Sequence, residues 1–149
     1  MQDADPFDLR RFLTAQEGAY RAALSELAAG QKRGHWMWFV FPQIDGLGFT
    51  STSKRYAIKS LAEARAYLDH PVLGARLREC ARALLPLKGA TAERIFGYPD
   101  HLKLRSSMTL FAAAAPEEAV FRSVLERYYE GAPDARTSEI LARMGANGE

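Results

Sequence analysis

Apolar residues along this chain recur mainly every three or four positions, which is the spacing of one face of an α-helix. The first long stretch of this kind covers residues 8–29, where Asp8 suits the helix start and Gly30 the stop. Its apolar stripe consists of Leu9, Phe12, Leu13, Tyr20, Leu24 and Leu27. The pattern therefore predicts one long amphipathic helix near the beginning of the chain.

Further helices are predicted wherever a helix-start signal precedes an apolar stripe. Ser60 and Glu63 match a capping box, and Pro71 suits the first turn of a helix. Thr91 suits an N-cap in front of a short helix that Gly97 ends. The predicted helical segments are 60–69, 71–85, 91–96, 100–114, 116–128 and 134–144.

These segments leave no clear alternating strand pattern, so the sequence predicts an all-α or nearly all-α fold. The content of 48% hydrophobic and 26% charged residues is that of an ordinary globular protein. A length of 149 residues fits one domain. We therefore expect a compact multihelical single domain over residues 1–149, with frayed ends at about residues 1–6 and 145–149.

Residues 34–43 are the least ordinary part of the chain, because five aromatic rings, counting His35, fall within seven residues. The segment is too short and too uniformly apolar for its period to decide between helix and strand. Pro42 ends any helix there, and residues 46–53 have the composition of a loop. A short strand pair in this region therefore stays open as an alternative.

Charge and targeting signals narrow the partners of the chain. The net charge is +2 and the isoelectric point is about 8.8, so a nucleic-acid partner is the weakest of the alternatives, resting on basic clusters at residues 53–59 and 76–82. The acidic N-terminus lacks the apolar run of a secretion signal, and no stretch reaches the length of a membrane span. With a single cysteine, Cys80, the chain is expected in the cytoplasm and without a membrane partner.

Metal and cofactor motifs are not visible in the sequence. His35, His70, His101 and Cys80 are not paired at the spacing of zinc ligands. The string Gly46-Leu47-Gly48 resembles half of a dinucleotide-binding fingerprint, but it does not lead from a parallel strand into a helix. We therefore expect neither a metal nor a cofactor.

The aromatic block supplies one set of candidate ligand-binding residues. His35 and Trp38 are candidates to stack on a planar ligand such as a nucleobase, and Gln43 is a candidate to read its edge. The simpler alternative is that these rings anchor the core. Gln16, a polar residue on the apolar stripe of the first helix, either forms a structural hydrogen bond or contacts the ligand.

A second set lies at the start of the predicted helix 100–114. Lys103, Arg105 and Ser107 are candidates to hold a phosphate or another polar group. Asp100 suits an N-cap, and a surface salt bridge with Lys103 is the simpler alternative for that pair. If the chain is an enzyme, Asp100 or Glu63 is the candidate general acid or base, and its pKa should then be raised.

Several strings together resemble a bacterial family catalogued as Domain of Unknown Function 1810. They comprise residues 15–16, 35–43, 46–48, 70–74, 95–97, 103–111 and 134–137. The resemblance implies a small multihelical single-domain fold and no established activity. Some members carry the label calpastatin, which does not suit a compact, repeat-free chain. A second similarity, to helical N-glycosidases that act on ADP-ribose and riboside-type metabolites, rests on the order of features alone.

Two functional hypotheses follow, and the shape of the surface separates them. One is an enzyme or binder for a small nucleotide-like or phosphorylated ligand. The alternative is a non-catalytic protein-interaction module that uses an exposed aromatic patch. A concave pocket that contains Trp38, Gln43 and Lys103 together favours the first, and a flat exposed aromatic patch favours the second.

Overall fold

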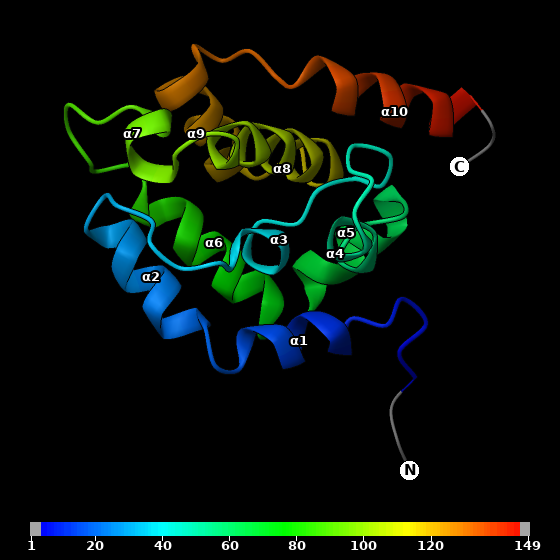
Figure 1. Cartoon of the computed structure of the whole chain (residues 1–149). Helices are drawn as coiled ribbons and strands as arrows, with labels where there is room; N and C mark the ends of the chain where they lie inside the picture. Colours follow the sequence, from blue (N-terminus) through cyan, green and yellow to red (C-terminus); the bar gives the residue numbers. More distant parts are fainter. Residues whose placement is uncertain (1–3, 147–149) are drawn as a thin grey trace.

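The computed structural model describes residues 4–146, which form ten α-helices (Figure 1). In chain order these are α1 (Arg10–Gln16), α2 (Tyr20–Ala28), α3 (Met37–Val40), α4 (Ser51–Arg55), α5 (Leu61–Asp69), α6 (Leu73–Ala83), α7 (Ala92–Phe96), α8 (Asp100–Ala114), α9 (Ala119–Tyr129) and α10 (Ala135–Ala146). Extended pairing within this part of the chain is limited to one isolated parallel bridge between Ile44 and Ile58. The predicted all-α fold is confirmed.

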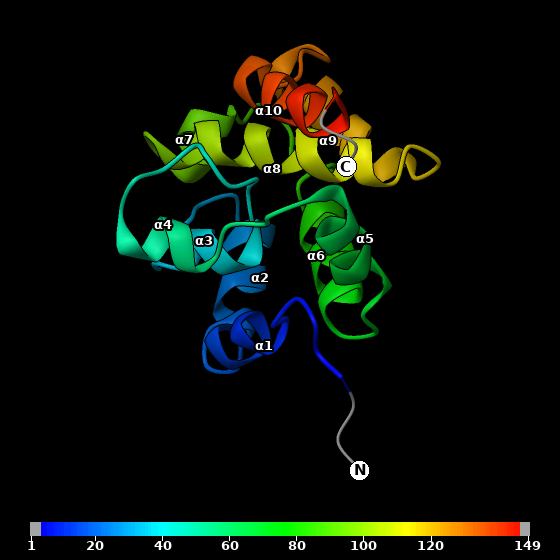
Figure 2. The same cartoon turned by 90° about the vertical axis from the view of Figure 1, so that its right-hand side faces the viewer.

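Helix α8 is the central element of the fold. Its residues from 106 to 111 are all buried, because α5, α7, α9 and α10 pack around it. Figure 2 shows α7, α8, α9 and α10 in one layer and α1 to α6 in the other. A helix that is buried on almost every side is typical of the core of a larger helical domain.

The predicted helix starts at Ser60 and Thr91 are confirmed. The Ser60 hydroxyl accepts a hydrogen bond from the backbone N–H of Glu63 at 3.1 Å. Thr91 does the same for the N–H of Arg94 at 3.1 Å. Helix α8 also spans Asp100–Ala114 as predicted. Local capping signals thus predict where α5 and α7 begin, and both helices pack against α8.

The single helix predicted for residues 8–29 is wrong. The chain turns at residues 17–19 and divides the segment into α1 and α2. Gly18 lies in that turn, where glycine disfavours a continuous helix. The predicted cap is also wrong: the Asp5 carboxylate accepts from the N–H groups of Leu9 and Arg10 at 2.8 and 3.0 Å, whereas Asp8 adopts a positive φ of 52°.

The two expected frayed ends fall partly outside residues 4–146. Inside that range, Asp5 is held by the hydrogen bonds described above, and α10 continues to Ala146. No helix in the described part of the chain is both long enough and apolar enough to cross a membrane.

The aromatic block divides between the core and the surface of α3. Trp36 and Phe41 are buried, and the Trp36 indole N–H donates to the Glu26 carboxylate at 2.9 Å. That carboxylate also accepts the backbone N–H groups of Arg33 and Gly34. Burial would raise the pKa of Glu26, but these hydrogen bonds lower it overall. The core interpretation therefore holds for Trp36 and Phe41, while Trp38 stays half-buried.

Candidate functional site

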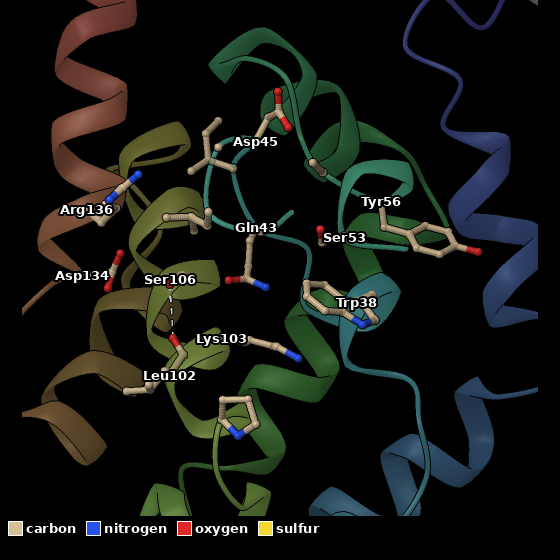
Figure 3. A pocket seen from close by; sticks show the side chains of 16 residues that line it. Trp38, Gln43, Asp45, Ser53, Tyr56, Leu102, Lys103, Ser106, Asp134 and Arg136 are labelled. Carbon is tan, nitrogen blue, oxygen red and sulfur yellow. Dashed lines mark hydrogen bonds between the residues drawn. The ribbon is translucent and has the colours of Figure 1, made fainter. Parts of the chain in front are cut away.

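A cavity of about 230 Å³ lies where α3, the segment 43–48, α4, the start of α8 and the start of α10 meet. Trp38, Gln43 and Lys103 all line it (Figure 3). The two strings that sequence reasoning selected, 35–43 and 100–111, thus contribute to one concave site.

Gln43 reaches the cavity because the chain pairs with residues beyond α4. The N–H of Ile58 donates to the carbonyl of Gln43, and the N–H of Asp45 donates to the carbonyl of Ile58, both at 2.8 Å. Ile44 and Ile58 are buried in the core, which fixes this short bridge. Figure 3 shows the Gln43 amide pointing between Ser106 and Trp38. Within residues 4–146 this amide makes no side-chain hydrogen bond, so its donor and acceptor groups are available to a ligand.

The glycine-rich segment of the cavity wall depends on close packing. A Cβ atom at Gly48 would lie 2.6 Å from the Cβ of Ser53, a separation that no side chain can adopt. Gly46 has a φ of +109°, which favours glycine. These glycines therefore shape the wall of the pocket, and they do not form a phosphate-binding loop of the dinucleotide type.

Lys103 approaches the cavity from α8. Its ammonium lies 3.9 Å from the centroid of the Trp38 ring and donates to Oδ1 of Asp100 at 3.0 Å. The other oxygen of Asp100 pairs with Lys32 at 2.7 Å. The predicted ion pair between Asp100 and Lys103 is confirmed, although it is shared with a second lysine and only 19% of each side chain is exposed.

The expectation that Asp100 caps its helix is not met, and the shift of its pKa is opposite to the one expected of a general acid or base. Asp100 is the first residue of α8, and the residue before the helix, Pro99, provides no side-chain cap. Burial alone would raise the pKa of Asp100, but hydrogen bonds from Lys32 and Lys103 outweigh burial and lower it. The prediction of a raised pKa is therefore wrong, and the Asp100 side chain does not line the cavity.

Glu63, the other candidate acid or base, lies outside the cavity. It is 2% exposed and pairs with Arg11 at 2.7 Å. Its second oxygen accepts the N–H of Lys59 at 2.9 Å. These contacts explain Glu63 as a structural link between α1 and α5.

Gln16 is also explained by structural hydrogen bonds. Its amide donates to the carbonyl of Phe39 at 2.7 Å and to the hydroxyl of Tyr67 at 3.0 Å. Arg76 donates to its side-chain oxygen at 3.3 Å. Of the two interpretations of Gln16, the structural one accounts for every polar atom of the side chain, and Gln16 does not line the cavity.

Three further predicted site residues lie outside the cavity: His35, Arg105 and Ser107. His35 is exposed. Arg105 donates to the carbonyl of Ala132 at 3.0 Å, and its guanidinium lies 5.5 Å from the centroid of the Tyr129 ring. Ser107 is fully buried on α8, and its Oγ is the only buried side-chain nitrogen or oxygen atom in the described part of the chain without a hydrogen-bond partner. None of the three lines the cavity.

The start of α10 contributes residues that sequence reasoning missed. Asp134 and Arg136 line the cavity. The Asp134 carboxylate caps α10 by accepting the N–H of Thr137 at 2.9 Å, and its own N–H donates to the hydroxyl of Thr109 on α8 at 2.8 Å. An aspartate before a helix is readable as a cap, but the contact with Thr109 joins distant residues and leaves no local signal. Ser53, Tyr56 and Ser106 also line the cavity and were not among the predicted site residues.

Neither a metal cluster nor an activated cysteine accompanies this site. Among residues 4–146, no group of three or more His, Cys, Asp or Glu side chains is placed to hold a metal ion. Cys80 is buried in α6, and burial raises the pKa of its thiol to about 12. At neutral pH this cysteine is a protonated core residue.

Comparison with known proteins gives two matches. The model of a family described as "Protein of unknown function (DUF1810)" matches residues 6–141. The crystal structure of the conserved hypothetical protein Rv1873 from Mycobacterium tuberculosis is 54% identical, with a TM-score of 0.91, over 93% of this chain and 99% of that one. No protein with a curated description matches. The family and fold are therefore established, while the function has to be inferred from the site.

Proposed function

The chain belongs to the DUF1810 family of proteins of unknown function, and we propose that its pocket binds a small planar ligand with an anionic group, such as a nucleotide or another phosphorylated metabolite, in the cytoplasm. One observation carries this proposal: Trp38, Gln43 and Lys103 line the same cavity. Concave sites with apolar walls and a few converging polar groups are the usual form of small-ligand sites.

Each of the three residues offers a different contact. An indole ring stacks on any planar base, and the half-buried Trp38 presents its ring to the cavity. The Gln43 amide both donates and accepts, as the edge of an amide-containing heterocycle requires. Lys103 supplies positive charge, but its ammonium covers part of the Trp38 ring. A stacked ligand therefore lies on the portion of the ring that Lys103 leaves open.

The second cation of the pocket is Arg136 and not Arg105 as predicted. The Arg136 side chain is exposed at the start of α10 and forms no ion pair or hydrogen bond with the described residues. Its guanidinium is thus available for the two parallel hydrogen bonds that phosphates and carboxylates accept. Arg105 instead holds the loop before α10 through Ala132.

The cavity volume favours a ligand with one ring system. Drug-sized ligands occupy pockets of about 300–1,000 Å³, and this cavity measures about 230 Å³. A mononucleotide whose phosphate projects toward the rim suits that volume better than a dinucleotide that is enclosed completely.

An N-glycosidase reaction is the more demanding form of the same proposal. It needs a carboxylate beside the sugar carbon that becomes positively charged. Asp45 and Asp134 are the carboxylates that line the cavity, and Asp134 already caps α10. Release of free base from a nucleotide, followed by chromatography, tests this form. Absence of release in the presence of demonstrated binding would restrict the protein to a binding role.

A second candidate function is the binding of a protein partner, which exposed apolar side chains near the pocket favour. Phe49 is 84% exposed and directly follows Gly48 of the cavity wall. Tyr98 is 75% exposed and directly precedes Pro99 of the cavity wall. Exposed aromatic residues are frequent anchors of protein interfaces. A partner retained by the wild-type protein and lost by both Phe49→Ser and Tyr98→Ser would support this function.

The test of the main proposal is a thermal-shift screen with nucleotides, nucleosides, ADP-ribose, NAD and phosphorylated metabolites. A ligand at 100 times its dissociation constant stabilises the native state by about 2.7 kcal/mol, which raises Tm by several degrees. We expect Lys103→Met to remove the shift and the exposed Lys88→Met to retain it. No shift across the panel, or an equal shift in Lys103→Met, would contradict the proposal.

A further inference from the structure

We infer that Lys32, which pairs with Asp100 and does not itself line the pocket, is a positioning residue that sets the positive charge Lys103 presents to an anionic ligand. The inference rests on the proposed function for its ligand. The charge distribution is nevertheless a property of the free protein, so it can be measured without any ligand.

The geometry behind the inference is one carboxylate shared by two ammonium groups. Oδ2 of Asp100 pairs with Lys32 at 2.7 Å, and Oδ1 pairs with Lys103 at 3.0 Å. A single lysine with Asp100 would form a pair without net charge. With both lysines, this triad carries a net charge of +1, and Lys103 is its member in the cavity wall.

Lys32 is fixed in this position by buried contacts. Only 8% of its side chain is exposed, and its ammonium also donates to the carbonyl of Gly34 at 2.6 Å. It lies 5.1 Å from the centroid of the buried Trp36 ring. An ammonium held this firmly cannot turn away to solvent, so its charge acts on Asp100 continuously.

Glu26 is the other carboxylate near Lys32, and its contacts keep it out of the triad. One of its oxygens accepts three N–H groups, from Arg33, Gly34 and the Trp36 indole. It forms no ion pair with Lys32 among the described residues. The Lys32 ammonium also lowers the pKa of Glu26 through its charge, so Glu26 offsets part of the charge of Lys32. It does not alter the sign of the effect of Lys32→Met on Lys103, because removing an ammonium makes its surroundings less positive.

Two opposite consequences follow for the pocket. Without Lys32, Asp100 would neutralise Lys103 alone, and the pocket would attract anions less. Without the Asp100 charge, both lysines would remain uncompensated, and the pocket would attract anions more. A purely structural role would make both substitutions disturb the pocket in the same direction, so the signs discriminate between the two explanations.

Collisional quenching of tryptophan fluorescence measures this charge directly. Trp36 is 2% exposed, so dissolved quenchers report on Trp38, the second of the two tryptophans and part of the cavity wall. Iodide is anionic, caesium is cationic and acrylamide is neutral. The ratio of the iodide to the acrylamide quenching constant therefore reports local potential and cancels changes in exposure.

We expect Lys32→Met to lower that ratio about twofold at low ionic strength. Under partial screening, the loss of one nearby unit charge changes the local concentration of an anionic quencher by about that factor. Asp100→Asn should raise it by a similar factor, and caesium should show the reverse pattern. Lys32→Arg should restore the wild-type ratio, because it keeps the charge. Lys88→Met, which changes an exposed lysine away from the cavity wall, should leave the ratio unchanged.

An unchanged ratio in Lys32→Met, or shifts of the same sign in Lys32→Met and Asp100→Asn, would overturn the inference. Circular dichroism in the near ultraviolet establishes that each variant is folded. If Lys32→Met does not fold, the polar neutral variant Lys32→Gln replaces it, since a ratio that stays constant or rises in that variant contradicts the inference. If the ratios change as expected and no ligand of the screen binds, the proposed function fails while the role of Lys32 stands.

Discussion

Glu63 and Asp100 are two acidic side chains held by basic partners, yet their clusters differ in how completely the partners are used. Arg11 directs all its donor atoms to fixed acceptors: one bond reaches Glu63, and the others reach the carbonyls of Phe7, Asp8, Arg55 and Ala57. A guanidinium has five N–H donors, so this cluster has no capacity left for a ligand. One positive charge meets one negative charge.

The Asp100 cluster contains two positive charges and one negative charge, and one of its ammonium groups lies in the wall of the cavity. An ammonium has three donors, and Lys103 uses one of them on Asp100. A saturated ion pair such as Arg11 with Glu63 therefore indicates a structural role. An ion cluster with excess charge beside a cavity is a better candidate for binding.

The largest expected effect is the loss of stability in Arg11→Ala. Removing the guanidinium leaves the 2% exposed Glu63 without its countercharge, which costs about 3–5 kcal/mol of the free energy of unfolding. Urea denaturation measures the change. The exposed neighbour Arg10→Ala is the matched control and should stay within about 0.5 kcal/mol of the wild type. Equal losses in both variants would contradict the structural role assigned to Arg11.

Asp100→Asn should cost less, about 1–3 kcal/mol at pH 7, because it weakens hydrogen bonds to two charged partners. The loss should also depend on pH. The folded pKa of Asp100 is lowered, so its stabilisation is complete above the unfolded pKa near 4 and disappears as the pH falls through the folded value. Urea midpoints at pH 7, 4 and 3 should therefore converge for the two proteins. A difference that stays constant over this range would refute the assignment.

The smallest expected effect concerns Ser107, whose buried hydroxyl has no partner. Ser107→Ala removes an unsatisfied polar group and should raise the free energy of unfolding by about 1 kcal/mol. Ser106→Ala is the matched control, since the Ser106 hydroxyl donates to the carbonyl of Leu102 at 3.2 Å. If Ser107→Ala destabilises the protein more than Ser106→Ala, Ser107 has a polar role that the structure does not explain.

Features of the fold that depend on neighbouring residues could be predicted from the sequence. The caps at Ser60 and Thr91 and the limits of α8 follow from residues within one or two turns. The turn at residues 17–19 was missed because the apolar stripe continues across Gly18. Asp5, and not Asp8, accepts hydrogen bonds at the start of the first helix because the residues before that helix fold back onto its first turn. The spacing of apolar residues gives no sign of this.

The candidate site was predictable in its residue types but not in its assembly. Trp38 and Gln43 attract attention because they belong to one aromatic run that ends in an amide, and Lys103 because it lies in a polar stretch at the start of a predicted helix. Their meeting depends on the bridge between Ile44 and Ile58. Arg136 looks like an ordinary surface arginine in the first turn of a helix. Its place at the cavity follows from a hydrogen bond between Thr109 and a residue 25 positions away.

The hydrogen bond from the Asp134 backbone to Thr109 completes a pocket made of three segments that lie far apart in the chain, residues 38–57, 99–106 and 134–136. Bringing such segments together requires closure of long loops. The entropy lost in that closure is offset only once the segments make their native contacts. We therefore expect the complete pocket to form late in folding, once all three segments are in place. A bound ligand would slow amide hydrogen exchange through global unfolding in all three segments together, which makes occupancy of the pocket a measure of the fully folded population.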